Sequence, residues 1–185
     1  MTVWLVRHGA TDWTDAGRFN GWTDVPLNER GIEQAHELAT TLELSDDVTI
    51  WSSDLIRARS TAAALGPPRI DARLRELDFG ELEGLTWGRC DLATREALVA
   101  FDGFVAPGGE SVAALGARID AFLADLFRDG RREGEHVVVT HGGVIRLFLR
   151  RHSGDRHVAP GEAVRLPVER WPVAPESDAA HNRYQ

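Results

Sequence analysis

The sequence predicts an α/β fold, a three-layer α/β/α sandwich in which helices cover both faces of a mainly parallel sheet. Three short runs rich in β-branched residues, 3–6, 48–51 and 136–140, are bounded by polar residues or glycine and have the composition of buried strands. Segments with helical spacing lie between these runs, and strands that alternate with helices are typical of a parallel sheet. A chain of 185 residues is long enough to form one domain around its own core.

Two helices are predicted in the first half of the chain. One follows the turn at 28–31 and places its apolar residues on one face over 32–42. Ser53 has a side chain suited to the N-cap position, so the second helix is expected to begin at Asp54. The sequence Gly-Pro-Pro at 66–68 ends that helix, because proline cannot continue it.

The second half of the chain predicts two more long helical segments and a final strand. A long apolar stripe extends over 112–126, and a helix at 144–149 follows the third strand directly. The segment 161–168 is expected to add a last strand to the sheet. A polar tail at 171–185 follows, so the domain is expected to span 1–170.

Residues 84–110 interrupt the alternation of strands and helices. They combine glycine, proline and polar residues around a weak helical pattern at 91–100. We expect this segment to be an insertion that covers one end of the sheet as a lid.

The charge and composition of the chain argue against several classes of protein. The formal net charge of −8 disfavours a nucleic-acid-binding protein, because affinity for DNA or RNA comes largely from Lys and Arg that neutralise phosphates. No stretch approaches the roughly 20 apolar residues of a membrane span, and the N-terminus begins on a strand pattern rather than a signal peptide. The single cysteine, Cys90, makes neither an internal disulfide nor a cysteine-rich metal site. These features predict a cytoplasmic protein and do not decide between a monomer and a homodimer.

Polar clusters follow the three predicted strands at the point where each strand ends: 7–9, 52–57 and 141–143. Because the carboxyl ends of parallel strands meet at one edge of a sheet, two histidines and two arginines are expected to converge there. A phosphoryl group in transfer spreads negative charge over its oxygens and needs cationic donors around it, with a nucleophile in line. The chain has no lysine, and the planar fork of arginine suits bidentate contact with phosphate oxygens. The clusters therefore predict a phosphoryl-transfer site.

Each residue of this predicted site has a chemical role. His8 can attack through one ring nitrogen if the other donates its hydrogen to a backbone carbonyl. Arg7, Arg57 and His141, the last as a cation, are expected to hold the phosphate oxygens. The amides that begin the helix at Gly142 add a dipole that favours an anion. Protonation of the leaving oxygen requires a carboxylic acid near the phosphate.

Several blocks of the sequence resemble the histidine phosphatase superfamily, also called the phosphoglycerate mutase-like superfamily. The blocks that carry the resemblance are, in order, 5–11, 17–24 with 26–31, 52–58, 74–84, 107–111 and 140–143. The resemblance implies a phosphoglycerate mutase-like fold and a metal-independent phosphomonoesterase that works through a phosphohistidine on His8. It also implies that Arg7, Arg57 and His141 bind phosphate.

The resemblance further implies that Glu76 protonates the leaving group and then activates the attacking water. Glu83 is the main alternative for this acid, and Asp78 and Glu81 are the other carboxylates of the same block.

Two more positions are candidate contacts with phosphate or substrate. Relatives often carry asparagine where this chain has Thr14, whose shorter side chain can still donate a hydrogen bond. Asn20 stands where relatives often have glutamine. Trp13 and Trp22 flank these positions, and we expect them to pack in the core, with substrate stacking as the alternative.

The resemblance leaves more than one activity open. A phosphatase hydrolyses the phosphohistidine, whereas a cofactor-dependent phosphoglycerate mutase returns the phosphoryl group to a bound substrate and has a longer, arginine-rich insertion. Residues 84–110 contain only Arg89 and Arg95, which favours the phosphatase branch and a chain similar to broad-specificity phosphatases and α-ribazole phosphatases. A non-catalytic phospho-ligand-binding protein would lack the nucleophile, an arginine or the acid, and none is missing. Protein phosphohistidine phosphatases tend to be shorter and have a smaller lid, so the insertion at 84–110 and the presence of Glu76 argue against this class.

The expected partner of the chain is a small phosphorylated metabolite, with no metal, cofactor, nucleic acid or membrane. Metal dependence is not predicted, because no group of Asp and His residues has the spacing of metal ligands.

Overall fold

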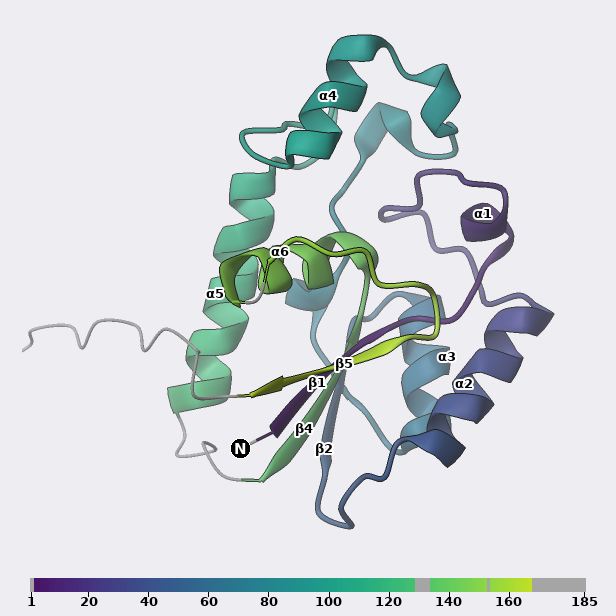
Figure 1. The fold of residues 1–185 in the computed structure, drawn as a ribbon, viewed down its shortest axis with the longest axis vertical. Helices are drawn as coiled ribbons and strands as arrows, with labels where there is room; N and C mark the ends of the chain where they lie inside the picture. The colour runs from purple at the N-terminus through teal and green to yellow at the C-terminus, as the bar shows by residue number, and fades with distance from the viewer. Residues whose placement is uncertain (1, 129–133, 153, 168–185) are drawn as a thin grey trace, which may run out of the picture.

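The computed structural model describes residues 2–128, 134–152 and 154–167, and within them five strands form one sheet (Figure 1). The strands are β1 (Thr2–Arg7), β2 (Thr49–Ser52), β3 (Arg69–Ile70), β4 (Glu135–Thr140) and β5 (Ala163–Pro167). Their order across the sheet is β3-β2-β4-β1-β5. The first four strands are parallel and β5 pairs with β1 in the antiparallel direction. The predicted α/β fold with a mainly parallel sheet is confirmed.

The three strands predicted with most β-branched residues occupy the centre of this sheet, in the order β2-β4-β1. The register pairs Val6 of β1 with Val139 of β4, so these two strands end side by side. The final segment at 161–168 contains β5, as expected. The two-residue strand β3 was not expected, because both of its side chains are exposed and leave no apolar pattern.

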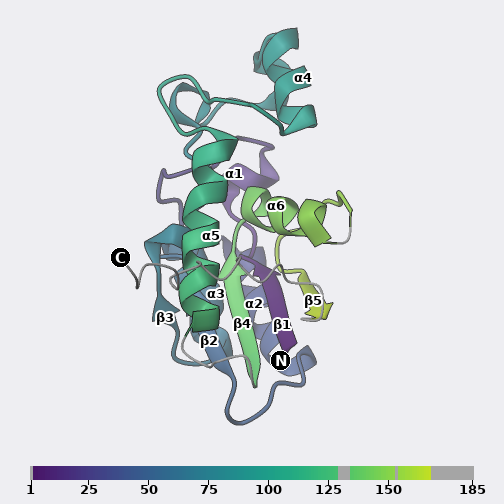
Figure 2. The same ribbon diagram turned by 90° about the vertical axis from the view of Figure 1, so that its left-hand side faces the viewer.

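Helices cover both faces of the sheet. They are α1 (Asp12–Asp15), α2 (Glu29–Thr41), α3 (Ile56–Leu65), α4 (Leu92–Ala100), α5 (Val112–Arg128) and α6 (Gly142–His152), with turns of 3-10 helix at Ala72–Leu74, Gly80–Leu82 and Trp87–Arg89. Figure 2 shows α5 and α6 in front of the sheet and α2 and α3 behind it. Successive strand residues point to opposite faces, so each face has its own core. Val6 and Val139 pack with α2 and α3, whereas Val3, Leu5 and Val138 pack with α5 and α6.

Helix α3 begins two residues later than predicted, and Ser53 does not cap it. The N-cap residue is Leu55, which has no side-chain hydrogen bond to the helix. The Ser53 hydroxyl instead accepts from the Leu55 amide at 3.3 Å, and the first helical amide, that of Ile56, donates to Asp24 at 2.7 Å. A carboxylate from a distant loop therefore satisfies the helix start.

The segment at 84–110 extends beyond the carboxyl ends of the central strands and carries α4 (Figures 1 and 2). Asp91 caps α4 by accepting from the Thr94 amide at 2.7 Å, so the predicted helix at 91–100 is present. Its interpretation as a lid stays a prediction. The tail predicted at 171–185 lies outside the described residues. Across the described part of the chain, no helix has the length and apolar character needed to cross a membrane.

Candidate active site

The loop after β1 holds His8 in one orientation. The ring is 3% exposed, and its Nδ1 lies 2.7 Å from the carbonyl oxygen of Gly9. A carbonyl only accepts, so Nδ1 carries the hydrogen and Nε2 keeps its lone pair. Burial and the charges of Arg57 and Arg7 hold the pKa of His8 well below its usual value of 6.5, so the ring is neutral at pH 7. His8 is therefore arranged as a nucleophile.

Glycines allow the His8 loop to pack directly against the start of α2. A Cβ on Gly9 would clash with the backbone of Gly31, and a Cβ on Gly31 would clash with Ala10. The Gly31 amide donates to the side chain of its N-cap residue, Asn28, at 2.9 Å. This close approach fixes the loop without any side chain between the two segments.

His141 follows β4 and lies beside His8. Their ring centroids are 5.1 Å apart with an interplanar angle of 60°, and the His8 amide donates to the Thr140 carbonyl at 3.0 Å. His141 is fully buried, and neither ring nitrogen has a hydrogen-bond partner among the described residues. Burial, then the charge of Arg57, holds its pKa well below 6.5. Burial beside arginines therefore favours the neutral ring in the free protein, and the cationic form expected while His141 holds a phosphate stays a prediction.

Two arginines complete the cationic wall of the site. Arg57, from α3, is fully buried and donates to the carbonyls of Gly21 at 2.6 Å and Thr23 at 3.1 Å. Burial lowers the pKa of Arg57 to about 10, and the nearby carboxylate of Glu76 opposes this shift. Arg7 donates to the Val158 carbonyl at 2.7 Å, and burial also lowers its pKa. Both side chains remain charged at neutral pH.

Buried polar atoms of this cluster have no hydrogen-bond partner among the described residues. The Nε atoms of Arg7 and Arg57 and both ring nitrogens of His141 have no hydrogen-bond partner in the described part of the chain. Buried polar groups without partners are rare in folded proteins and call for an explanation. Unpaired N–H groups on two arginines, beside a helix start, fit an anion.

Glu76 is the carboxylate that the structure brings to this cluster. It is 6% exposed, and its Oε2 accepts from the Gly143 amide at the start of α6 at 2.9 Å. Its Oε1 accepts from the Leu77 amide at 2.9 Å, and its charge acts on both Arg7 and Arg57. The carboxyl group predicted to be the acid therefore lies beside the positive groups that would hold a phosphate.

The competing carboxylates have other partners. Glu83 accepts from the amides of Trp22 at 2.6 Å and Thr23 at 2.7 Å, which fixes the loop that holds Arg57. Asp78 accepts from the Gly80 amide at 2.9 Å, and Glu81 is exposed. This geometry favours Glu76 over Glu83 as the acid.

The three remaining candidate contacts, Thr14, Asn20 and Gly142, differ in how available they are to a phosphate. The Thr14 hydroxyl forms a capping box with Thr11, accepting from its amide at 2.8 Å and donating to its carbonyl at 2.9 Å. Its hydrogen-bonding capacity is used in α1, so the geometry offers little for a phosphate. Asn20 is buried with an unpaired Oδ1 in the described structure. At Gly142, a Cβ would lie 3.2 Å from Cζ of Arg7, so glycine allows the guanidinium to approach the helix start.

Sequence reasoning missed Arg118 and misjudged Trp22. Arg118 of α5 and the Trp22 indole both donate to the carbonyl oxygen of Glu76, at 2.7 Å and 2.8 Å. The Trp22 side chain is not in the core, because the residue is 40% exposed and Arg75 lies 4.8 Å above its ring. Trp13 is half-buried. Backbone carbonyls are the acceptors in both contacts, and such contacts leave no pattern in a sequence.

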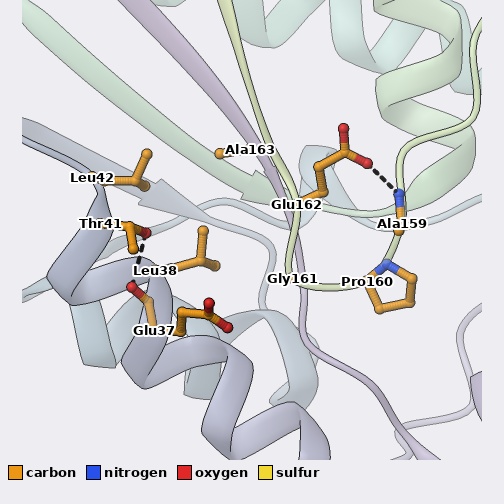
Figure 3. Close-up of a pocket in the computed structure, with 9 residues that line it drawn as sticks. All are labelled: Glu37, Leu38, Thr41, Leu42, Ala159, Pro160, Gly161, Glu162 and Ala163. Atoms are coloured by element: carbon orange, nitrogen blue, oxygen red, sulfur yellow. Dashed lines mark hydrogen bonds between the residues drawn. The ribbon is translucent and has the colours of Figure 1, made fainter.

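A separate hollow of about 360 Å³ lies between α2 and the loop before β5 (Figure 3). Its lining includes Leu38 of α2, the C-cap residue Leu42, two carboxylates, and Gly161. The Gly161 amide donates to the carbonyls of Arg7 and His8, so the hollow lies behind the nucleophile loop and contains none of the predicted site residues. Among residues 2–128, 134–152 and 154–167, no three His, Cys, Asp or Glu side chains gather in a way that could hold a metal ion.

Comparisons with known proteins agree with this geometry. The chain is 36% identical over 195 residues to a metal-independent phosphoserine phosphatase of Arabidopsis thaliana, covering 96% of this chain and 81% of the relative. It is 34% identical to a glucosyl-3-phosphoglycerate phosphatase of Mycobacterium tuberculosis, covering 91% and 78% of the two chains.

Solved structures share both fold and sequence with the chain. TTHB049 from Thermus thermophilus is 44% identical with a TM-score of 0.83, and a phosphoglycerate mutase from the same organism is 44% identical with a TM-score of 0.81; each comparison covers 92% of this chain and 95% of the other. A candidate alpha-ribazole-5'-P phosphatase from Escherichia coli is 29% identical with a TM-score of 0.75, covering 91% and 92%. The model of the histidine phosphatase superfamily (branch 1) matches residues 3–166. The chain therefore belongs to the histidine phosphatase superfamily, branch 1.

Proposed function

We propose that the chain is a metal-independent phosphomonoesterase that hydrolyses a small phosphorylated metabolite through a phosphohistidine on His8. The observation that carries this proposal is the neutral, oriented imidazole of His8 beside buried nitrogen atoms of Arg7, Arg57 and His141 that have no hydrogen-bond partner among the described residues. The family and the relatives named as phosphatases support it.

In the first step, Nε2 of His8 attacks the phosphorus and the bond from phosphorus to the ester oxygen breaks. The guanidinium groups of Arg7 and Arg57 and the amides at the start of α6 stabilise the negative charge on the equatorial oxygens. His141, neutral before the substrate arrives, gains a favourable partner in the phosphate for a ring N–H. Glu76 gives its proton to the leaving oxygen, so the product departs as an alcohol.

In the second step, a water molecule attacks the phosphohistidine. Glu76, now a carboxylate, takes a proton from this water while the bond from phosphorus to Nε2 breaks. Inorganic phosphate forms and His8 returns to its neutral state. Positive charge from side chains and helix amides serves throughout, so none of these steps requires a metal ion.

Phosphoryl transfer of the mutase type is the second candidate, because one similar solved structure is a phosphoglycerate mutase. A mutase must exclude water and retain its intermediate for re-phosphorylation. The segment 84–110 supplies only Arg89, which is exposed, and Arg95, whose Nε donates to the Asp91 carbonyl at 3.4 Å. With only these two arginines in the segment, little positive charge is available to retain a phosphorylated product, which favours its release and hence hydrolysis.

Phosphate release in EDTA from a panel of phosphomonoesters tests the proposal. The panel contains L-phosphoserine, glucosyl-3-phosphoglycerate, and 3-phosphoglycerate with and without 2,3-bisphosphoglycerate. Release by the wild type that is lost in His8→Ala supports hydrolysis through phosphohistidine, and His36→Ala, an exposed histidine on α2, is the matched control. Isomerisation of 3-phosphoglycerate without release would move the chain to the mutase activity, and appreciable turnover by His8→Ala would refute the mechanism.

The role of Glu76 has its own test in the same assay. Glu76→Gln should slow esters with poor leaving groups by about 10²-fold or more, because an alkoxide cannot leave without a proton. An activated aryl phosphate, whose leaving group needs little protonation, should lose far less in kcat/KM, the quantity to compare because it excludes the second step. Equal losses on both esters would show that Glu76 is not the general acid.

A further inference from the structure

Arg118, near the middle of α5, has a fully hydrogen-bonded guanidinium group. A guanidinium has five N–H donors in a rigid plane. Nε donates to Oε1 of Glu110 at 2.8 Å, and Nη2 donates to Oε2 of Glu110 at 2.9 Å and to the Glu76 carbonyl at 2.7 Å. Nη1 donates to the carbonyls of Arg73 and Arg75, both at 2.6 Å. Each of the five donors therefore has an acceptor.

Three of these acceptors are carbonyls of the segment that ends at the proposed acid. The Glu76 carbonyl also accepts from the Trp22 indole at 2.8 Å, so this oxygen is held by two donors from different parts of the fold. A fixed peptide plane fixes the direction in which the side chain leaves the backbone. The carboxylate of Glu76 then reaches the Gly143 amide at 2.9 Å.

Glu110 also bonds to the backbone on the C-terminal side of Glu76. Its amide donates to the Asp78 carbonyl at 2.9 Å, and the Asp78 amide lies 3.4 Å from its Oε2. The Arg118 and Glu110 side chains are only 16% and 13% exposed, so the pair is held away from solvent. Backbone on both sides of Glu76 is thus tied to one ion pair.

We propose that Arg118, with Glu110 as its counter-ion, is a positioning residue that holds Glu76 for proton transfer to and from the reacting oxygen. The inference rests on the proposed role of Glu76. Arg118 bonds to the backbone of Glu76, so it acts through the placement of the acid. A displacement of about 1 Å at a reacting group is enough to cost a large part of the rate.

The test compares an ester with a poor leaving group, L-phosphoserine, with the activated ester p-nitrophenyl phosphate. Arg118→Met should lower kcat/KM, which reports only the step that releases the alcohol, by about tenfold or more on the poor ester and by less than about threefold on the activated ester. Arg118→Lys retains the charge but not the planar fork, so it should shift the same ratio to a smaller extent. If Arg118→Met does not fold, the comparison of the two esters is made with Arg118→Lys instead.

Arg151→Met is the matched control. Arg151 of α6 pairs with Asp120 of α5, the helix that carries Arg118. This pair is exposed, and within the described part of the chain its ion pair involves no residue of the proposed site. Its loss should leave the ratio of the two rates unchanged. A ratio shift in this variant as well would show that any disturbance of α5 has the effect, and would overturn the specific role of Arg118.

A double variant separates positioning from general destabilisation. In a Glu76→Gln background, an Arg118 replacement should change the ratio no further, because there is no acid left to position. If the single Arg118 variants lose activity equally on both esters, Arg118 has only a structural role and the inference is overturned. If Glu76→Gln itself lowers both rates equally, the proposed acid fails and this inference fails with it. Dependence on His8 would still stand in that case, so the two failures are distinguishable.

Discussion

Lowering the pH should destabilise the fold through the two buried histidines of the site. Burial and neighbouring charges hold the pKa values of His8 and His141 well below 6.5 in the folded chain, whereas both rings titrate near 6.5 when unfolded. Below pH 6.5 the unfolded chain therefore binds more protons than the folded chain, and the free energy of unfolding falls as the pH falls. The stability is fully present above pH 6.5 and is lost progressively between 6.5 and the lowered pKa values.

The size of the effect follows from proton linkage. Each histidine that stays neutral in the fold contributes a slope approaching about 1.4 kcal/mol per pH unit. For a ring that stays neutral over the whole range from about pH 7.5 to about pH 5, this amounts to at most about 2 kcal/mol, and for two such rings to at most about 4 kcal/mol. A typical domain has about 5–15 kcal/mol of stability, so the loss is a large fraction of the total.

Chemical denaturation across this pH range measures the effect directly. His141→Gln replaces a ring that titrates by an amide that does not, so its free energy of unfolding should fall by about 2 kcal/mol less than that of the wild type. The carboxylates and the other histidines are common to both proteins and cancel. His36→Gln, the same substitution at an exposed position of α2, is the matched control. Parallel curves for wild type and His141→Gln would refute the reasoning, because His141 would then have to titrate alike in both states.

Two further predictions concern residues whose side chains are already engaged. Thr14→Ala should lower the free energy of unfolding by about 1 kcal/mol through loss of the capping box of α1 and leave kcat/KM within about twofold of the wild type; a large loss of kcat/KM would make Thr14 a phosphate ligand after all. Glu83→Gln should raise KM severalfold, because the loop that holds Arg57 loses one acceptor, while the ratio of rates on poor and activated esters stays unchanged. A changed ratio would instead give Glu83 a share in proton transfer.

The sheet and the convergence of the site were predictable because both depend on local patterns. β-Branched runs identified β1, β2 and β4, and the rule that parallel strands end at one edge placed His8 and His141 together. The start of α3 was not predictable in the same way. Its first amide is satisfied by Asp24, which is distant in sequence, so the presence of Ser53 was a misleading signal.

The charge state of His141 and the role of Arg118 required the packed structure. A histidine after a strand can be charged or neutral, and only its complete burial beside Arg57 decides for the neutral form. Arg118 lies within an apolar helical stripe, and three of its five contacts are to backbone carbonyls that every residue possesses. Sequence patterns record side-chain types, so contacts of this kind become visible only when the segments are placed in space.

The electrostatics of the site explain how an acidic chain can act on an anion. The net charge of −8 is a property of the whole sequence, whereas Arg7 at the end of β1 and Arg57 in the first turn of α3 place two positive charges with buried Nε atoms at the site. Burial disfavours their charges, and the carboxylate of Glu76 opposes this by favouring the charged form of both. A phosphate that accepts from the unpaired Nε atoms would take over this neutralisation. The first step requires Glu76 to carry a proton, and with the arginines neutralised by the phosphate its carboxylate is no longer needed as their counter-ion. The same carboxylate can thus balance the arginines in the free protein and serve as the acid once an ester is bound.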